Sequence, residues 1–354
     1  MRIVHGVRYC LTPLAVLLLT LPLTAQGQVR ILQTTEAGDR VFIIDPATNK
    51  VVGAIPGIER AHGVAASPDG SRIYVSNEAD DTLDVADVKT LKVIKKIPLS
   101  GLPNNIAISP DGRRVYVGIR RAVGNNPGVA DVIDTASLSK IKSIRTEGPV
   151  HNLYVTPDGK HVVAGDASRS GYVSVLDTQT DAPAWSVPLG QNIRPMAIST
   201  NPDGSTRSLF AQIGSHNGFA VVDFQTRKEV ARITLPKLAP GRIPIPTGSS
   251  ESHGIAVTPD QRTLVVCSRL NNALYSYSLP DVKLAGTAYL TGKGCQWVSV
   301  TPDSQRAYLA DPVGGSTLVV DIPSMKEVAK IAIGYVSPSR NHTMVIPAGR
   351  PATQ

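Results

Sequence analysis

One short phrase recurs roughly every 45 residues along this chain and constrains its fold more than any other feature. An apolar run leads into Ser/Thr-Pro-Asp, often followed by Gly, and a second apolar run comes after it. The turn prolines are Pro68, Pro110, Pro157, Pro202, Pro259 and Pro302. A period of this size indicates a repeat architecture.

Each repeat contains four short runs, which in one repeat lie at 63–67, 72–76, 82–87 and 93–99. Apolar and polar residues alternate in these runs, and β-branched residues are common, so the runs are predicted to be strands. The Ser/Thr-Pro-Asp-Gly phrase suits a tight turn, because Pro fixes φ and Gly accepts positive φ. A second turn repeats Asp-x-x-Thr/Ser, as at Asp87 and Thr90, where both side chains can bond turn amides. Four antiparallel strands per repeat predict a propeller blade.

The two ends of the repeat region complement each other. Residues 29–36, 40–45 and 50–55 supply the second to fourth strands of a blade, and 343–346 supply a lone first strand. Their pairing would close the ring and remove its exposed edges. Six full repeats and this composite blade predict an all-β, seven-bladed β-propeller over residues 28–349, with a tail at 350–354.

Two strands carry the sequences Ile-Tyr-Val-Ser-Asn at 73–77 and Val-Tyr-Val-Gly at 115–118. In these strands and in its repeats over residues 29–349, the chain resembles the YVTN-type seven-bladed β-propeller repeat family. That family includes surface-layer and periplasmic binding propellers, with kinship to lactonases and to the propellers of cytochrome d1 and nitrous oxide reductase. The resemblance implies a propeller and leaves any reaction open.

Residues 1–27 have the pattern of a cleavable signal peptide. Arg2 and Arg8 precede an apolar run at 11–23, and Ala25-Gln26-Gly27 offers small residues before the cut. The apolar run is too short for a membrane span, which needs about 20 residues. We therefore expect a periplasmic or secreted monomer with no membrane span.

The chain is moderately basic, with 36 Lys and Arg against 28 Asp and Glu and a net charge of +8. This excess favours an anionic partner, although it also serves solubility alone. The partners expected from the sequence are a protein, a glycan or another anionic ligand.

One position in each repeat is predicted to begin the innermost strand at one mouth of the central channel. It lies six residues before the turn Pro, or eight before Pro202, where the repeat has a two-residue insertion at Thr200-Asn201. This mouth lies on the face with the longer loops, including an insertion at 236–252 that is typical of a lid or binding loop. The residues at this position, with the one that follows the last of them, are His62, Asn104, His151, Arg194, His253, Gln296, Asn341 and His342. Nearby strand ends add Asn77, Arg120, Asp166, Arg269 and Asp311. Polar groups that converge over a channel predict a ligand-binding site.

His62, His151 and His253 are candidate ligands for a divalent metal, because imidazoles from several elements are how such sites are assembled. The competing interpretation is that each His caps its strand by hydrogen bonding. Cys267 and Cys295 fall in adjacent blades and form either a disulfide or two buried thiols. The sequence has no Cys-x-x-Cys-His, so it predicts no covalent haem.

The leading functional prediction is a non-enzymatic binding module whose ligand lies at the loop-rich face over the central channel. No Gly-x-Ser-x-Gly nucleophile motif is present. The alternative is a metal-assisted lyase or lactonase that uses the histidine ring. A third possibility is an electron-transfer propeller with non-covalent haem. The sequence has only four Phe and two Trp to build a haem pocket, which argues against this possibility.

Overall fold

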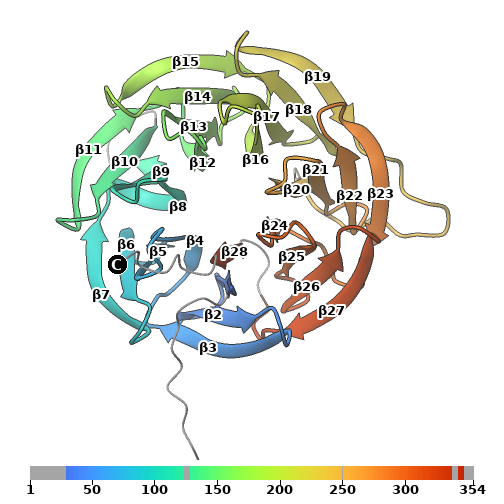
Figure 1. Cartoon of the computed structure of the whole chain (residues 1–354), viewed down its shortest axis with the longest axis horizontal. Coiled ribbons are helices and arrows are strands. Elements are labelled where there is room, and N and C mark those ends of the chain that lie inside the picture. Colours follow the sequence, from blue (N-terminus) through green and yellow to red (C-terminus); the bar gives the residue numbers. More distant parts are fainter. Residues whose placement is uncertain (1–28, 123–127, 249, 337–341, 347–354) are drawn as a thin grey trace, which may run out of the picture.

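The computed structural model describes residues 29–122, 128–248, 250–336 and 342–346. Within these ranges, seven antiparallel sheets of four strands are arranged as blades around a central channel (Figure 1). The predicted seven-bladed β-propeller is therefore confirmed. No helix in the described ranges is long and apolar enough to cross a bilayer. The predicted signal peptide and the tail at 350–354 lie outside the described residues.

The strands fall into four concentric rings (Figure 1). The innermost ring is β4 (Ala61–Ala66), β8 (Gly101–Ile108), β12 (Val150–Val155), β16 (Ile193–Thr200), β20 (Ser252–Val257), β24 (Trp297–Val300) and β28 (Thr343–Ile346). The second is β1 (Arg30–Gln33), β5 (Arg72–Asn77), β9 (Arg114–Ala122), β13 (His161–Asp166), β17 (Thr206–Ile213), β21 (Thr263–Ser268) and β25 (Arg306–Asp311). The third is β2 (Arg40–Asp45), β6 (Thr82–Asp87), β10 (Val129–Asp134), β14 (Tyr172–Asp177), β18 (Gly218–Asp223), β22 (Ala273–Ser278) and β26 (Ser316–Asp321). The outermost is β3 (Lys50–Pro56), β7 (Lys92–Pro98), β11 (Ser139–Arg145), β15 (Ala182–Pro188), β19 (Lys228–Thr234), β23 (Lys283–Tyr289) and β27 (Lys326–Ala332).

The ring closes where the last strand joins the first blade. β28 pairs with β1 in antiparallel register, with Ile31 opposite Val345, and the sheet order is β28-β1-β2-β3. The Thr34 amide donates to the His342 carbonyl at 2.9 Å just beyond this pair. The composite blade predicted from the two ends is therefore present.

The repeated turns act through their side chains as expected. Asp69 accepts hydrogen bonds from the Ser67 hydroxyl and the Ser71 amide, and Gly70 has a φ of 70°. In the second turn type, Asp87 accepts from both the amide and the hydroxyl of Thr90. The Thr90 amide is the main reason that the pKa of Asp87 is lowered. Both phrases are therefore folding devices on the face opposite the longer loops.

The core lies between neighbouring blades. One cluster joins Tyr116 and Val132 of the third blade to Val150, Leu153 and Val162 of the fourth. Strands near the channel are buried on both faces, whereas the outermost strands are largely exposed. The free energy gained is about 25 cal/mol for each Å² of apolar surface buried, so inter-blade contacts hold the ring rigid around its channel.

The long insertion does not cover the channel, in contrast to the lid expected from its length. It connects β19 to β20 and projects past the outer edge of β23 (Figure 1). The Arg242 guanidinium lies 4.3 Å from the ring centroid of Tyr289 on β23, while Ile243 is 87% exposed. This cation–π contact holds the insertion at the rim.

Candidate functional site

The position counted from each turn Pro does begin the innermost strands. His62, Asn104, His151, Arg194 and His253 lie in β4, β8, β12, β16 and β20, and Gln296 and His342 directly precede β24 and β28. Together these residues are called the channel mouth. Asn341 lies outside the described residues.

These side chains lie at interruptions of the strand ladders. The register between first and second strands shifts between Ala61 and Val64 in one blade and between Pro103 and Ile106 in the next. The same shift spans His151, Arg194 and His253 in the three blades that follow. A bulge kinks its strand and redirects a side chain. The bulges therefore redirect these side chains at the strand ends, where His62, Asn104, His151 and His253 remain buried.

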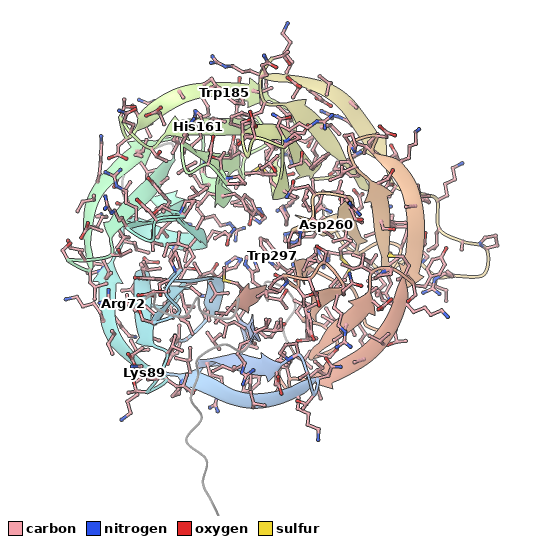
Figure 2. The ribbon with its side chains drawn as sticks, in the orientation of Figure 1. Arg72, Lys89, His161, Trp185, Asp260 and Trp297 are labelled. Atoms are coloured by element: carbon pink, nitrogen blue, oxygen red, sulfur yellow. A yellow bond between two sulfur atoms is a disulfide. The ribbon has the colours of Figure 1, made fainter. Side chains whose placement is uncertain are left out.

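Four imidazoles and one indole form a row at the mouth. The ring centroids of His62 and His342 are 4.5 Å apart, and those of His151 and His253 are 5.6 Å apart, each pair edge to face. Trp297 stacks on His342 at 3.7 Å and lies 6.4 Å from His253. Figure 2 shows Trp297 near the centre of the ring. Four of these five rings lie in the innermost strands β4, β12, β20 and β24, and the fifth, that of His342, directly precedes β28.

The protein engages Nδ1 in three of the four imidazoles. His62 Nδ1 is 2.5 Å from the Glu78 carboxylate, and His253 Nδ1 donates to the Gln296 carbonyl at 2.5 Å. His151 Nδ1 is paired with the Asn152 amide. Fixing one ring nitrogen sets the orientation of the ring and reserves Nε2 for another partner.

Burial keeps three of these imidazoles neutral at physiological pH. It lowers the pKa of His151, His253 and His342 well below the usual range. The positive charge of Arg194 lowers the pKa of His151 and His253 further, and Arg120 and Arg269 each add to the effect on one of them. Three arginines from different blades therefore create a positive field at the channel mouth.

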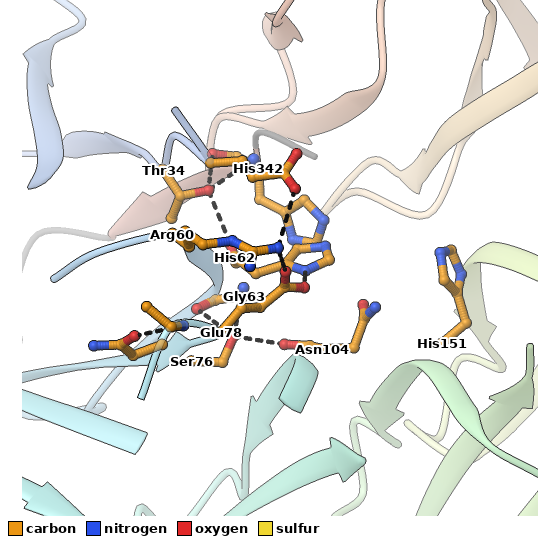
Figure 3. Close-up of polar contacts among 12 residues, drawn as sticks. Thr34, Arg60, His62, Gly63, Ser76, Glu78, Asn104, His151 and His342 are labelled. Atoms are coloured by element: carbon orange, nitrogen blue, oxygen red, sulfur yellow. Dashed lines mark hydrogen bonds and ion pairs between the residues drawn. The ribbon is translucent and has the colours of Figure 1, made fainter. Parts of the chain in front are cut away.

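Asn104 is the least satisfied polar group there. Its side chain is 0% exposed, and neither its Oδ1 nor its Nδ2 has a hydrogen-bond partner. Figure 3 shows it between His62 and His151. A buried amide without partners costs about 1–3 kcal/mol.

Glu78 and Trp297 are parts of the site that the sequence did not indicate. The Glu78 side chain is 1% exposed, and its second oxygen pairs with Arg60 at 3.2 Å (Figure 3). Each of the two lies one residue beyond a position that the repeat pattern did single out, Asn77 and Gln296. Reading one further residue at each strand end would have found them.

A disulfide supports the Trp297 side of the mouth. Cys267 at the end of β21 is bonded to Cys295, and their Cα atoms are 6.2 Å apart. Cys295 directly precedes Gln296 and Trp297, so the bond ties the segment that positions His253 to the neighbouring blade. Arg120 lies in β9, and Arg269 follows β21 with its guanidinium 3.4 Å from the Ser250 carbonyl.

The three predicted metal ligands fall into separate pairs. His151 faces His253, whereas His62 faces His342. Across the described ranges, no three His, Cys, Asp or Glu side chains are grouped so that they could hold a metal ion. A metal centre built on His62, His151 and His253 stays a prediction of the sequence, and no step below uses it.

Comparisons with known proteins support the fold. No protein-family model matches the chain, and no curated protein sequence does. A solved chain of hydrazine synthase from Kuenenia stuttgartiensis superposes with a TM-score of 0.71 at 21% identity, covering 88% of this chain and 99% of that one. Dihydro-heme d1 dehydrogenase NirN, solved in complex with DHE, superposes with a TM-score of 0.61 at 19% identity, covering 89% of this chain and 64% of that one. At these identities, the similarity shows a shared propeller fold.

Proposed function

We propose that this chain is a binding propeller that takes a small anionic ligand at the channel mouth, on the face with the longer loops. The site combines a positive field, neutral imidazoles whose Nε2 atoms are held in fixed orientations, and an indole. Converging polar and aromatic groups are the usual lining of a small-molecule site.

The Asn104 amide is the observation that carries this proposal. Most buried side-chain amides in folded proteins are hydrogen-bonded, and those that are not require an explanation. Asn104 leaves both of its polar atoms without partners, and it lies between His62 and His151 in Figure 3. A ligand that accepts a hydrogen bond from Nδ2 and donates one to Oδ1, directly or through a water, would remove this cost.

The charge of the ligand follows from the field at the mouth. Arg194 disfavours protonation of both His151 and His253, and Arg120 and Arg269 each act on one of them. A field that opposes an added proton attracts an anion. The most exposed acidic groups of the repeat turns, such as Asp87, lie on the opposite face.

The ligand can be detected through Trp297. The chain has two Trp, and Trp185 lies on the rim in β15, far from Trp297 (Figure 2). A Trp185→Phe variant therefore reports on the mouth alone. Its fluorescence would be titrated with phosphate, citrate, 2-oxobutyrate, 2-oxoglutarate and haemin. Haemin is included because a dihydro-heme d1 dehydrogenase is among the solved propellers that superpose on this chain.

We expect a saturable change with at least one of these anions. In the Asn104→Leu background the affinity should fall about tenfold or more, because a lost hydrogen bond to a charged group is worth about 1.5–3 kcal/mol. His161→Gln, in β13 at the opposite face, is the matched control and should bind as the parent does. No saturable change with any anion, or equal affinity after Asn104→Leu, would overturn the proposal.

A further inference from the structure

We propose that the channel mouth also transfers a proton on the ligand it binds, with His62 as the base and Glu78 as its positioning residue. The substrate class is a small carboxylate with a C–H bond next to a carbonyl group. This inference rests on the proposed function, since the substrate must first occupy the mouth.

His62 and Glu78 have the geometry of a base and the group that orients it. Their closest atoms, Nδ1 and Oε1, are 2.5 Å apart, and the two side chains are 4% and 1% exposed. A carboxylate at Nδ1 holds the proton there, so Nε2 carries the lone pair that accepts a proton. The same logic, a base held by a third group, recurs in unrelated catalytic sites.

The protein also fixes the position of the His62 ring. The Thr34 hydroxyl accepts from the His342 amide and donates to the His62 carbonyl, both at 2.8 Å (Figure 3). The His342 ring packs edge to face against His62. No described residue hydrogen-bonds to His62 Nε2. The backbone of His62 is therefore held by Thr34 and its ring by Glu78 and His342, and its basic nitrogen remains for a ligand.

A group that stabilises negative charge lies on the adjacent strand. The Gly63 amide donates to Ser76 Oγ at 2.8 Å, and Ser76 Oγ donates to the Asn104 carbonyl at 2.5 Å. Ser76 thereby links the backbone next to His62 to that of Asn104. The buried Asn104 Nδ2 is a preorganised donor, and such donors act most strongly on charge that develops in a water-excluded site.

The reaction needs no oxidant, reductant or further reactant. The arginine field binds the carboxylate, and the carbonyl oxygen of the substrate faces Asn104 Nδ2. The C–H bond breaks, its proton forms a bond to His62 Nε2, and its electron pair becomes the C=C bond of an enolate with the charge on oxygen. Return of a proton from Nε2 to carbon completes the cycle. The proton on Nε2 exchanges with solvent while the enolate is bound, so in D2O a deuteron returns to carbon and the released substrate carries deuterium in place of hydrogen.

The competing account is that the pair is structural. A buried ion pair does little for stability by itself, but removal of one partner is costly. The two accounts differ in what Glu78→Gln changes. That variant keeps an acceptor for the Nδ1 proton while removing the negative charge. A structural role predicts lower stability and weaker binding, whereas a positioning role predicts slower turnover at unchanged affinity.

The test is exchange of the C3 protons of 2-oxobutyrate and 2-oxoglutarate in D2O, followed by proton NMR on the full chain. We expect saturable exchange about 100-fold or more above buffer, the lower range for general base catalysis. Glu78→Gln should slow the saturated rate about tenfold while half-saturation stays within about twofold. His62→Gly should abolish exchange, and added imidazole should restore part of it. His161→Gln should exchange as the parent does.

The failures are distinguishable. If either oxo acid changes Trp297 fluorescence saturably without exchange, the proton-transfer proposal is wrong and the binding function stands. If other anions bind but neither oxo acid does, the substrate class is wrong. If no anion binds, both proposals fall. If Glu78→Gln melts far below the parent, imidazole rescue of His62→Gly decides, and absence of rescue in a folded His62→Gly variant overturns the assignment of the base.

Discussion

The Asn104 side chain affects both the stability of the ligand-free protein and the binding of a ligand at the channel mouth. Two of its neighbours have Nδ1 engaged: His253 Nδ1 bonds the Gln296 carbonyl, and His62 Nδ1 lies against the Glu78 carboxylate. Asn104 alone among these has no partner for either side-chain polar atom. A buried polar group without a partner requires an explanation, and binding of a ligand is one such explanation.

Asn104→Leu should therefore stabilise the ligand-free protein by about 1–3 kcal/mol, because an apolar side chain of similar size removes the unsatisfied amide. Thermal unfolding by calorimetry measures the change. Asn271→Leu is the matched control, since Asn271 is equally buried but bonds the Pro236 carbonyl and the Tyr275 hydroxyl. That control should lose stability. A stability loss in Asn104→Leu would show that the amide is satisfied in the free protein.

The buried imidazoles give stability a pH dependence. Burial holds the pKa of His151, His253 and His342 well below 6.5 in the folded chain. In the unfolded chain they take up protons near their usual pKa of about 6.5. The unfolded state therefore binds more protons below that pH, and stability is complete above it and falls as the pH decreases.

We expect the free energy of unfolding to fall below about pH 6.5 with a limiting slope of about 1.4 kcal/mol per pH unit for each such imidazole. Denaturant unfolding at several values between about pH 7 and pH 5 measures it, a window above the titration of most carboxylates. His253→Gln should reduce the limiting slope by the contribution of one imidazole, about 1.4 kcal/mol per pH unit. A flat profile, or an unchanged slope in that variant, would contradict neutral burial.

At the scale of elements, the site depends on bulges in the innermost strands. Alternating apolar residues and the Ser/Thr-Pro-Asp-Gly turns were enough to place the strands, because those signals lie within each repeat. The ladder shifts beside His62 and His253 were not predictable, because they depend on pairing with the second strand. The pairing of His62 with His342 joins residues from the two ends of the chain, so no local signal contains it.

Gly254→Ala tests the bulge that presents His253. Gly254 has a φ of 110°, and an added Cβ would lie 3.0 Å from the Trp297 Cα. We expect a loss of about 1–3 kcal/mol in stability from the backbone strain, together with altered Trp297 fluorescence. Gly53→Ala is the control, since its Cβ would make ordinary contacts at 3.7 and 3.8 Å. Equal effects of the two substitutions would contradict a special role for this bulge.

At the scale of the whole molecule, the rigid ring is what brings the row of imidazoles together. His342 lies beside His62 because β28 pairs with β1 and so joins the blade that precedes β4. The repeat count and the complementary ends predicted this closure. The sequence did not predict the rim position of the insertion at 236–252, because that depends on a contact between Arg242 and a distant strand.

Deletion of residues 342–354 should destroy cooperative folding. It removes β28 and His342, leaving the second strand of the first blade as an open edge. Calorimetry should show loss of the single sharp transition, and size-exclusion chromatography should show association through the exposed edge. A truncated chain with the parent melting temperature and a monomeric elution would contradict closure by β28.

The measurement that tests the central claim most directly is a high-resolution crystal structure of the protein with the tightest anion found through Trp297. The account predicts density for that anion at the channel mouth, within hydrogen-bond distance of the Asn104 amide. It also predicts contact with the Nε2 atom of at least one of His62, His151 and His253. An anion bound elsewhere, with the Asn104 amide satisfied only by ordered water, would contradict the account.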